Sequence, residues 1–428
     1  MGELGEDSSV VVVVGASLAG WRAVETLRSE GYGGAITLVG EELHLPYDRP
    51  PLSKQVLAGT WPPEKAVLAD TRRTDELRVR EVLGRRAVGL DAAGRKVTLH
   101  DGTVLSADGV VIATGAAPRQ LPSVGDLGPR DGLFTLRTMD DSVALRAAVT
   151  GRDSARVVII GAGFIGAEVA STCAGLGCRV TVLEALDIPL APVLGPMVGG
   201  HCASLYRSHG VTLQLGVSVA GVRRGSEGDA GAVAGAGADT GVPSLVVELA
   251  DAEAVAADVV VVGIGVAPLT GWLDDSGLTT ENGVVCDGRL FAADGVVAAG
   301  DVARWRWRYD GTEELIRIEH WQVAAEAGVA AARSLLAGRA DATAFTPIPY
   351  FWSDQFGIRF QVLGSPGGGD EVVIADGSLD EGKFVALYGR AGRLRAVMAI
   401  GRPRQLMGFR PLLEAGTSWD DALAHAAG

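Results

Sequence analysis

Two glycine turns, each at the end of a run of β-branched residues, predict an α/β fold with two Rossmann-like nucleotide-binding domains. The first run, Val10–Val14, leads into Gly15-Ala16-Ser17-Leu18-Ala19-Gly20. The second run, Val157–Ile160, leads into Gly161-Ala162-Gly163-Phe164-Ile165-Gly166. Short apolar runs after Phe345 predict an additional C-terminal α+β domain. A chain of 428 residues is longer than one hydrophobic core usually supports, so several domains are expected.

Each turn is suited to hold the pyrophosphate of a dinucleotide. The strand must turn sharply into a helix whose first amide groups face the phosphates, and a side chain there would keep the backbone away. The second turn has all three glycines, whereas Ser17 stands in place of the middle glycine of the first turn. This departure weakens the first pattern without cancelling it. Two such turns predict two adenine dinucleotides held at once, as hydride transfer from a nicotinamide to a flavin requires.

An acidic residue follows the next predicted strand after each turn. Ala35–Gly40 runs into Glu41, and Arg179–Leu183 runs into Glu184, close to the usual spacing of about 20 residues from the last glycine. A carboxylate there accepts hydrogen bonds from the adenosine ribose. Glu184 would also repel a 2′-phosphate, and residues 185–187 offer no arginine to receive one, so NADH is predicted rather than NADPH. The alternative is that both carboxylates are ordinary solvated strand ends.

Composition excludes several classes of protein. A net charge of −14 argues against nucleic acid binding, which needs a basic surface. No stretch approaches the roughly 20 apolar residues of a membrane span, and Met1–Ser9 has no signal-peptide core. The 47% hydrophobic content with 60 glycines is typical of a buried parallel sheet with many tight turns. We therefore expect a soluble, cytoplasmic protein that binds neither nucleic acid nor membrane.

The four cysteines predict no redox-active disulfide. Cys173 and Cys178 lie on either side of a predicted helix end at Gly175–Gly177, which is interpreted as a poor geometry for a redox pair. With Cys202 and Cys286, they are expected to be small apolar residues in a reducing cytosol. Electrons would then pass from a flavin directly to the acceptor.

The order of the motifs predicts a flavin domain interrupted by a nicotinamide domain. The predicted segments are 1–118 and 263–328 for the FAD-binding domain, 119–262 for the NAD-binding domain, and 329–428 for the C-terminal α+β domain. The run Val110–Ala116 is predicted to be a buried strand that ends in a small-residue turn. Other predicted strands are Asp258–Val262, Arg359–Leu363, Glu371–Ile374, Lys383–Leu387 and Leu394–Ile400, and the predicted C-terminal helices are Pro411–Leu413 and Trp419–Ala427. The tract Gly225–Pro243 has too little apolar bulk to pack and is interpreted as a surface loop without assigned function.

Five motifs together resemble the flavoprotein pyridine-nucleotide oxidoreductases, and among them the putidaredoxin reductase-like NADH-dependent ferredoxin reductases of bacterial oxygenase and cytochrome P450 systems. The motifs are Leu45–Lys54, Ala113–Gly115, Ala299–Ala303, Arg317–Trp321 and Phe351–Gln355. The first and last distinguish this subgroup from the disulfide reductases, which have cysteines where this chain has Asp48–Lys54. The resemblance covers nearly the whole chain and implies a glutathione-reductase-like fold. Its departures are Ser17, the tract Gly225–Pro243 and the basic run Arg304–Arg308.

The resemblance also implies cofactor and catalytic roles. Asp301 would bind the FAD ribityl chain, Arg49 would neutralise the pyrophosphate, Arg137 would lie against the flavin, and the Ala87 backbone would meet the adenine. Lys54 would lie near the flavin N5 and pair with Glu168, on a helix predicted to open at Gly166, while Trp321 would lie along the isoalloxazine. The implied FAD-binding set is Gly15, Ser17, Leu18, Ala19, Gly20, Glu41, Arg49, Lys54, Ala87, Thr114, Gly115, Arg137, Asp301 and Trp321. The implied NADH-binding set is Gly161, Gly163, Phe164, Ile165, Gly166, Glu184 and Gly265.

Simpler interpretations stand beside these roles. Lys54 could be a solvated loop residue, and Glu168 alone would be an exposed helix residue without its partner. Trp321 and Trp352 could be ordinary core residues. His320 has no companion at a metal-ligand spacing and is interpreted as structural, so no metal site is predicted.

These observations predict hydride transfer from NADH to FAD, followed by single-electron transfers to a [2Fe-2S] ferredoxin that supplies a cytochrome P450 or oxygenase. Docking an acidic ferredoxin needs a local basic patch, for which Arg304, Arg306 and Arg308 are candidates, joined by Arg402 and Arg404. The alternative is a solvated basic loop with two packed tryptophans. Other acceptors left open are rubredoxin, a quinone or another small molecule such as monodehydroascorbate. An alternative outside the enzymes is an NADH-sensing flavoprotein that resembles apoptosis-inducing factor. A subunit of a larger reductase is disfavoured, because no cluster-binding cysteines follow the flavin domain.

Overall fold

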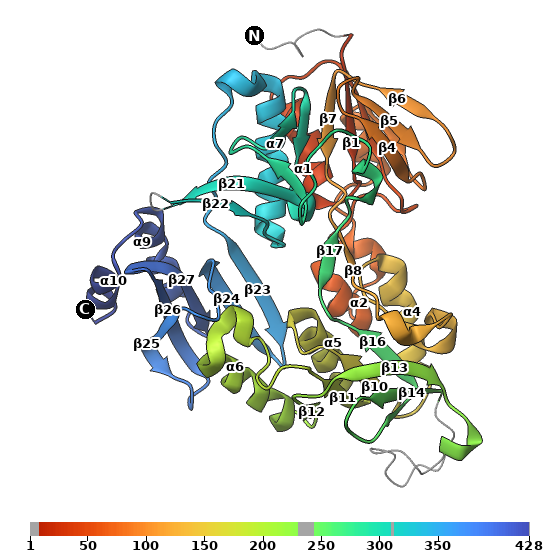
Figure 1. Cartoon of the computed structure of the whole chain (residues 1–428), viewed down its shortest axis with the longest axis vertical. Coiled ribbons are helices and arrows are strands. Elements are labelled where there is room, and N and C mark those ends of the chain that lie inside the picture. Colours follow the sequence, from red (N-terminus) through yellow and green to blue (C-terminus); the bar gives the residue numbers. More distant parts are fainter. Residues whose placement is uncertain (1–7, 230–243, 310–311, 428) are drawn as a thin grey trace. The chain divides into compact units, whose positions relative to one another are not determined.

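The computed structural model describes residues 8–229, 244–309 and 312–427, and the chain forms two compact units (Figure 1). The first unit comprises residues 1–48, 66–117 and 267–351, and the second comprises residues 49–65, 118–266 and 352–428. Residues 352–428 therefore belong to the same unit as the second glycine turn. The predicted domain boundaries stay a prediction.

The first unit is built on a six-stranded sheet in the order β19-β20-β7-β1-β2-β3. Its strands are β1 (Val10–Val14), β2 (Ala35–Val39), β3 (Val79–Val82), β7 (Gly109–Ile112), β19 (Phe291–Ala293) and β20 (Val296–Ala298). β1 runs parallel to β2 and β7, and its residues from Val11 to Val14 are at most 2% exposed. Such continuous apolar burial is typical of a parallel strand covered on both faces.

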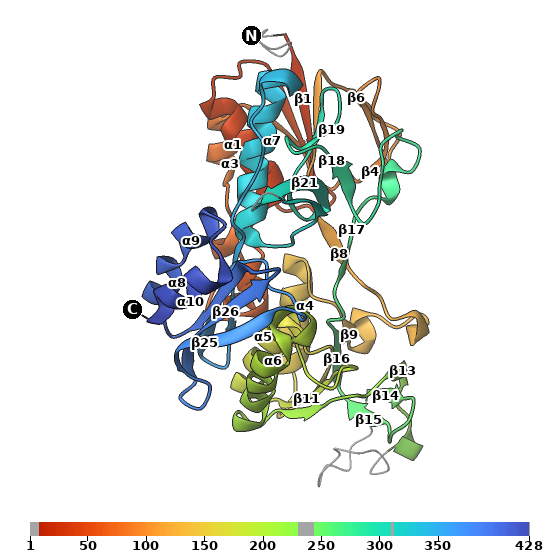
Figure 2. The same ribbon diagram turned by 60° about the vertical axis from the view of Figure 1, so that its left-hand side comes forward.

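Two helices cover this sheet and pack closely on each other. α1 (Leu18–Ser29) and α7 (Trp321–Asp341) lie side by side in both views (Figure 1, Figure 2). A Cβ added to Gly328 would lie 2.2 Å from the carbonyl oxygen of Ala19, so the helix contact requires a glycine there. α7 was not predicted from the sequence.

Smaller elements complete the first unit. They are α3 (Thr71–Glu76), the sheet of β4 (Ala87–Asp91), β5 (Lys96–Leu99) and β6 (Val104–Ser106), the sheet of β18 (Val284–Cys286), β21 (Ala303–Tyr309) and β22 (Thr312–Ile316), and the short helices η6 (Gly271–Leu273) and η7 (Gly300–Val302). The short helix η2 (Pro63–Ala66) spans the boundary, since residues 63–65 belong to the second unit. The run Val110–Ala116 is a buried strand that ends in a small-residue turn, as predicted. β7 ends at Ile112, and after Gly115, with φ +69°, the chain enters β8 (Ala116–Pro118), which pairs with β17 (Val266–Pro268).

The second unit contains a parallel sheet in the order β12-β11-β10-β16-β9. Its strands are β9 (Leu133–Phe134), β10 (Arg156–Ile160), β11 (Arg179–Leu183), β12 (Thr212–Gln214) and β16 (Val259–Val262), with helices α4 (Met139–Thr150), α5 (Phe164–Gly175) and α6 (Ala191–Ser208). α5 opens at Phe164, two residues before the predicted start at Gly166, because Gly163 is its N-cap residue. A three-stranded sheet of β13 (Val219–Arg224), β14 (Leu245–Leu249) and β15 (Val255–Ala257) packs on this sheet's apolar core.

The rest of the second unit is an antiparallel sheet in the order β23-β24-β27-β26-β25. Its elements are β23 (Tyr350–Gln355), β24 (Ile358–Gly364), β25 (Glu371–Ser378), β26 (Lys383–Arg390), β27 (Arg393–Ile400), α8 (Pro403–Gly408), α9 (Arg410–Glu414) and α10 (Trp419–Ala427). β24 to β27 are each longer than predicted. The other short helices of this unit are η1 (Pro50–Ser53), α2 (Gln55–Ala58), η3 (Pro122–Val124), η4 (Pro129–Asp131) and η5 (Glu227–Asp229), and residues 230–243 of the predicted surface loop lie outside the described residues.

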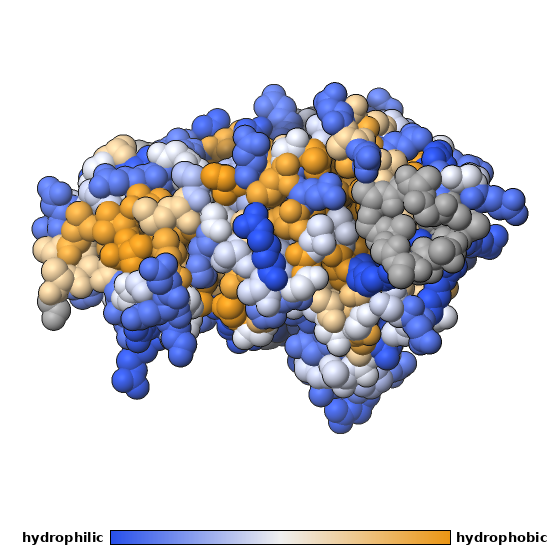
Figure 3. Space-filling view, turned by 90° about the horizontal axis from the view of Figure 1, so that it is seen from below, coloured by the Kyte–Doolittle hydropathy of each residue, from blue (hydrophilic) through white to orange (hydrophobic). Residues whose placement is uncertain are grey.

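One face of the protein carries both hydrophilic and apolar residues. Figure 3 shows strongly hydrophilic side chains spread over one face, with apolar areas between them. Such mixing is ordinary, since apolar atoms make up more than half of a typical folded surface. No helix within the described part of the chain is long and apolar enough to cross a membrane.

Candidate functional site

The glycines at the ends of the first turn are required by the packing of the backbone. Gly15 has φ +123°, and a Cβ there would lie 2.0 Å from the carbonyl oxygen of Ala113. A Cβ on Gly20 would lie 1.9 Å from the carbonyl oxygen of Gly15. Ser17, at the middle position, is the extended N-cap residue of α1, and its side chain makes no capping hydrogen bond. The first N–H groups of α1 are therefore not capped by Ser17 and can face an anion.

The second turn repeats this geometry with an open middle position. A Cβ on Gly161 would lie 2.4 Å from the carbonyl oxygen of Gly263, and one on Gly166 would lie 2.1 Å from that of Gly161. By contrast, no described atom lies within 4 Å of a Cβ built on Gly163. The fold itself therefore does not require this glycine, and the open space fits a pyrophosphate approaching the N-terminus of α5.

Glu184 is held beside the second turn. Its Oε2 accepts a hydrogen bond from the backbone N–H of Ala162 at 2.7 Å, and its Oε1 accepts one from that of Leu186 at 2.9 Å. The carboxylate is partly exposed and keeps further lone pairs for ribose hydroxyls. Glu41 is exposed and lies just beyond β2, after Gly40.

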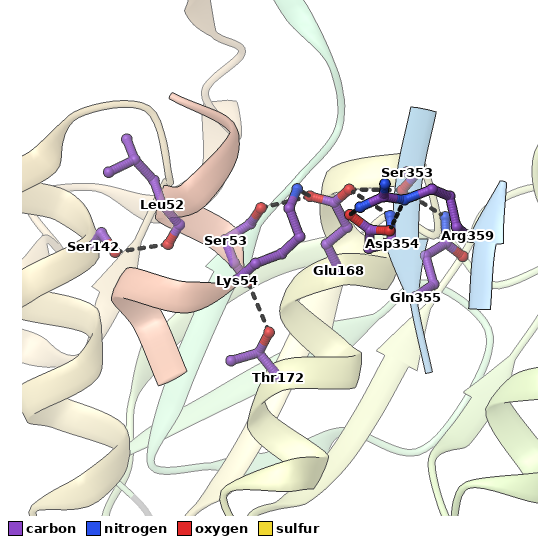
Figure 4. A network of polar contacts seen from close by, with 10 residues as sticks. All are labelled: Leu52, Ser53, Lys54, Ser142, Glu168, Thr172, Ser353, Asp354, Gln355 and Arg359. Atoms are coloured by element: carbon purple, nitrogen blue, oxygen red, sulfur yellow. Dashed lines mark hydrogen bonds and ion pairs between the residues drawn. The ribbon is translucent and has the colours of Figure 1, made fainter. Parts of the chain in front are cut away.

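The second unit also contains the expected ion pair between Lys54 and Glu168 (Figure 4). Lys54 Nζ lies 2.8 Å from Glu168 Oε2, and the two side chains are 13% and 4% exposed. Lys54 lies between η1 and α2, while Glu168 lies in the second turn of α5. A buried ion pair survives only where further hydrogen bonds compensate for lost hydration.

Those hydrogen bonds come from two elements, η1 and β23. Ser53 Oγ donates to Glu168 Oε2 at 2.5 Å, and Ser353 Oγ, from β23, donates to Oε1 at 2.7 Å. The backbone N–H of Asp354 donates to Oε1 at 3.3 Å. Each carboxylate oxygen thus accepts two hydrogen bonds, which fixes the position of the charge.

The donors are themselves held in place, as Figure 4 shows. Thr172 Oγ1 donates to the carbonyl oxygen of Ser53 at 2.8 Å, and Gln355 Nε2 donates to Ser353 Oγ at 3.0 Å. Arg359 binds the Asp354 carboxylate with its Nε at 2.6 Å. Ser53 and Ser353 were not predicted as site residues, although both lie within the motifs that carry the family resemblance.

The first unit contains several residues expected to bind FAD. Trp321, the first residue of α7, donates from Nε1 to Asp48 Oδ1 at 2.6 Å. Burial raises the pKa of Asp48 above its ordinary value, although the hydrogen bond from Trp321 opposes this. Asp301 lies in η7 after Gly300, and Thr114 Oγ1 donates to the carbonyl oxygen of Leu269 at 3.0 Å. The remaining predicted FAD-binding residues of this unit are Leu18 and Ala19 in α1, Ala87 at the start of β4, and Gly115.

The second unit contains the other predicted cofactor-binding residues. Arg49 Nη1 donates to the carbonyl oxygen of Arg137 at 2.5 Å, and the Arg137 N–H donates to Asp141 Oδ2 at 3.0 Å. Gly265 has φ +93°, which favours glycine. Phe164 and Ile165 open α5, where Ile165 is 50% exposed. The residues expected to bind FAD are therefore divided between the two units.

The basic run Arg304–Arg308 forms a strand, not a loop. Along β21, Trp305 and Trp307 are 1% and 3% exposed, while Arg306 and Arg308 point to solvent. Arg306 Nη1 and Arg308 Nη2 bind the Glu313 carboxylate at 3.1 and 2.8 Å, which offsets part of their charge. The alternating exposure follows from the two-residue period of a strand. The alternative interpretation was therefore right about the packed tryptophans and wrong about the loop.

His320 is buried, and its ring centroid lies 4.6 Å from that of Phe351. Burial lowers its pKa to about 4, so the ring is neutral near pH 7. Within the described residues, no group of three or more His, Cys, Asp or Glu side chains could hold a metal ion.

Comparison with known proteins places this geometry in a family. Residues 9–328 match the model of the pyridine nucleotide-disulphide oxidoreductases, and residues 350–427 match a model described as reductase C-terminal. Rhodocoxin reductase of Rhodococcus erythropolis is 34% identical, over 94% of this chain and 89% of the relative. The ferredoxin reductase component of chlorobenzene dioxygenase from Cupriavidus sp. (strain PS12) is 36% identical, over 96% of this chain and 94% of the relative. The structure of a covalent putidaredoxin reductase–putidaredoxin complex aligns with a TM-score of 0.87 and 28% identity, covering 98% of each chain.

Proposed function

Because the chain belongs to the pyridine nucleotide-disulphide oxidoreductase family, we propose that it is an NADH-dependent, FAD-containing ferredoxin reductase. Its acceptor would be a [2Fe-2S] ferredoxin that supplies a cytochrome P450 or an oxygenase. The names of the relatives support this acceptor, since they include rhodocoxin reductase and a dioxygenase ferredoxin reductase component. Bound FAD would supply the chemistry that links a two-electron donor to a one-electron acceptor.

The observation that carries the proposal is the pair of glycine turns. In each turn the outer glycines are required by close backbone contacts, and Gly163 leaves open space at the start of α5. The residues of the second turn would hold the NADH pyrophosphate, with Glu184 on the adenosine ribose. The first turn would hold the FAD pyrophosphate, with Glu41 on its ribose. Gly265 would approach the nicotinamide nucleotide.

The ion pair would act where the nicotinamide meets the flavin. Lys54 would place a positive charge near N5, and Glu168 would fix the position of that charge. A preorganised charge costs little reorganisation during the reaction, which is why a buried and fully hydrogen-bonded arrangement suits this role. Trp321 would cover the isoalloxazine, and its hydrogen bond to Asp48 limits its movement. Asp301, Arg49 and Arg137 would contact the rest of FAD.

We also propose an encounter surface for the ferredoxin on β21, at Arg304, Arg306 and Arg308. A local basic strand can attract an acidic partner even on a chain of net charge −14, because the shape of the field steers the encounter. The ion pairs of Glu313 with Arg306 and Arg308 must break in part when the partner binds, so that the arginines can interact with it. The proposed location is the cytoplasm, in keeping with four free thiols.

The proposal is tested by spectroscopy and turnover of the purified protein. Reconstitution with FAD should give a yellow protein that NADH bleaches under anaerobic conditions. A [2Fe-2S] ferredoxin should reoxidise it faster than a rubredoxin or a quinone does. A bleached protein with NAD⁺ bound that reoxidises very slowly with every carrier would overturn the reductase assignment in favour of an NADH sensor.

A further inference from the structure

Two cysteines, Cys173 and Cys178, lie close together at the C-terminal end of α5. The backbone N–H of Cys178 donates to the carbonyl oxygen of Cys173 at 3.1 Å, and that of Gly177 donates to Ala174 at 3.0 Å. Gly177 has φ +84°. These two hydrogen bonds and the left-handed glycine are the defining features of a Schellman motif, in which Cys173 and Cys178 occupy the positions whose side chains make contact.

This geometry fits a disulfide. The hydrogen bond between the two residues keeps their Cα atoms within about 7 Å, and the disulfide range is about 4.4–6.8 Å. The two thiols are close enough for each to shift the pKa of the other. The spacing of the two cysteines in the sequence predicts a poor geometry for a redox pair, whereas the Schellman motif brings the two residues close to the disulfide range.

The two sulfurs differ in access and acidity. Cys173 is fully buried, whereas Cys178 is partly exposed and its Sγ also lies 3.8 Å from the carbonyl oxygen of Val149. The neighbouring Cys173 thiol lowers the pKa of the Cys178 thiol, and the proximity of Cys178, together with burial, raises the pKa of Cys173. Reactivity follows thiolate character and exposure. Cys178 is therefore the sulfur that an oxidant meets first.

We propose that Cys173 and Cys178 form a reversible thiol-oxidation site, which a hydroperoxide converts into an intramolecular disulfide. The Cys178 thiolate attacks one peroxide oxygen, the O–O bond breaks, and hydroxide leaves a sulfenic acid on Cys178. Cys173 Sγ then attacks that sulfur, the S–S bond forms, and water leaves. Two electrons pass from the two thiols to hydrogen peroxide, which is reduced to two waters. This site is independent of the proposed electron transfer to ferredoxin.

The test uses the full-length holoprotein with hydrogen peroxide as the oxidant. Both cysteines lie in one tryptic peptide, residues 157–179, because no lysine or arginine interrupts it. After oxidation and alkylation we expect that peptide to be lighter by two hydrogens and unalkylated, and dithiothreitol to restore both alkylation sites. Alkylation of this pair at the same rate after peroxide as before would overturn the proposal.

Single variants separate the two roles. In Cys173→Ser, peroxide should leave a sulfenic acid on Cys178 that dimedone traps, whereas in Cys178→Ser the buried Cys173 should not react. Cys202→Ser is the matched control and should form the disulfide normally, since Cys202 is 1% exposed and burial raises its pKa to about 12. In the reduced wild type we expect Cys178 to be alkylated at least about ten-fold faster than Cys202. Dimedone labelling of Cys173 instead of Cys178 would contradict the order of the two steps.

Discussion

The most informative perturbation is Glu168→Gln, which removes one charge of the buried ion pair and keeps the shape of the side chain. The carboxylate accepts hydrogen bonds from Ser53, Lys54, Ser353 and the Asp354 N–H. A glutamine offers one acceptor oxygen, and its NH₂ group must replace the other. If the amide oxygen faces Lys54, the NH₂ group faces Ser353 and the backbone N–H of Asp354. The Ser353 hydroxyl can rotate to accept a hydrogen bond from this NH₂ group, whereas the Asp354 N–H can only donate and loses its acceptor.

The structure sets the size of the effect. Removing one partner of a buried ion pair costs about 3–5 kcal/mol, because the remaining charge is left desolvated. Lys54 is 13% exposed and the amide keeps some hydrogen bonds, so we expect about 3 kcal/mol. In a unit of roughly 240 residues, each kcal/mol shifts the Tm by about 2–4 °C. The second unit should therefore unfold about 6–12 °C lower in the variant.

The assay is thermal unfolding, followed with probes that report on each unit separately, because a chain with two units need not unfold in one step. Glu414→Gln is the matched control: it breaks an exposed i,i+4 pair with Arg410 at 3.0 Å and should cost less than about 1 kcal/mol. Combining Glu168→Gln with Lys54→Met should restore part of the lost stability, since no unpaired charge remains. A Tm within 1 °C of the wild type for Glu168→Gln would refute the reasoning.

Three further predictions concern the cofactor turn, the pH dependence and the partner. Gly163→Ala should raise the KM for NADH by about ten-fold and lower the Tm only slightly, because its Cβ meets only open space and the cost is limited to the change of the N-cap residue of α5. Gly166→Ala should lower the Tm much more, since its Cβ would lie 2.1 Å from the Gly161 carbonyl oxygen. The reverse pattern would contradict the account of the turn. Burial alone would raise the pKa of Asp258, but Arg156, at 2.8 Å, holds it below its ordinary value. The stability from this pair is thus present above about pH 4 and is lost as the pH falls through the lowered pKa. Asp258→Asn should therefore lower the Tm at pH 7, and the loss should become smaller as the pH falls below about 4. A loss of Tm that does not change with pH would argue against this assignment. Charge reversal at Arg306 and Arg308 should weaken ferredoxin reduction steeply at low salt and leave ferricyanide reduction intact; unchanged ferredoxin kinetics would remove β21 from the encounter surface.

Local patterns predicted the parallel strands well. β1 and β10 are runs of β-branched residues that end at glycine turns, so strand, turn and helix follow from consecutive residues. α7 was missed although it is the longest helix described in the chain, because its many small residues give little amphipathic signal and Gly328 suggests a break. That glycine serves a close contact with Ala19, which only the tertiary structure reveals.

The candidate site likewise contains contacts that the sequence alone does not reveal. Lys54 and Glu168 could be named from the family resemblance. Ser53 and Ser353 could not, because their role depends on bringing η1 and β23 against α5. The proximity of Cys173 and Cys178 was missed for a different reason. Their spacing and the glycine after the helix were visible in the sequence, but the contact follows from the backbone reversal that Gly177 permits.

An anaerobic titration of the FAD-reconstituted protein with NADH, followed by reoxidation with a [2Fe-2S] ferredoxin, tests the central claim that one chain binds both dinucleotides and couples them. We predict that one equivalent of NADH bleaches the flavin fully, and that two equivalents of ferredoxin restore its colour. A protein that remains colourless with excess FAD, or a yellow protein whose flavin NADH does not reduce, would contradict the account.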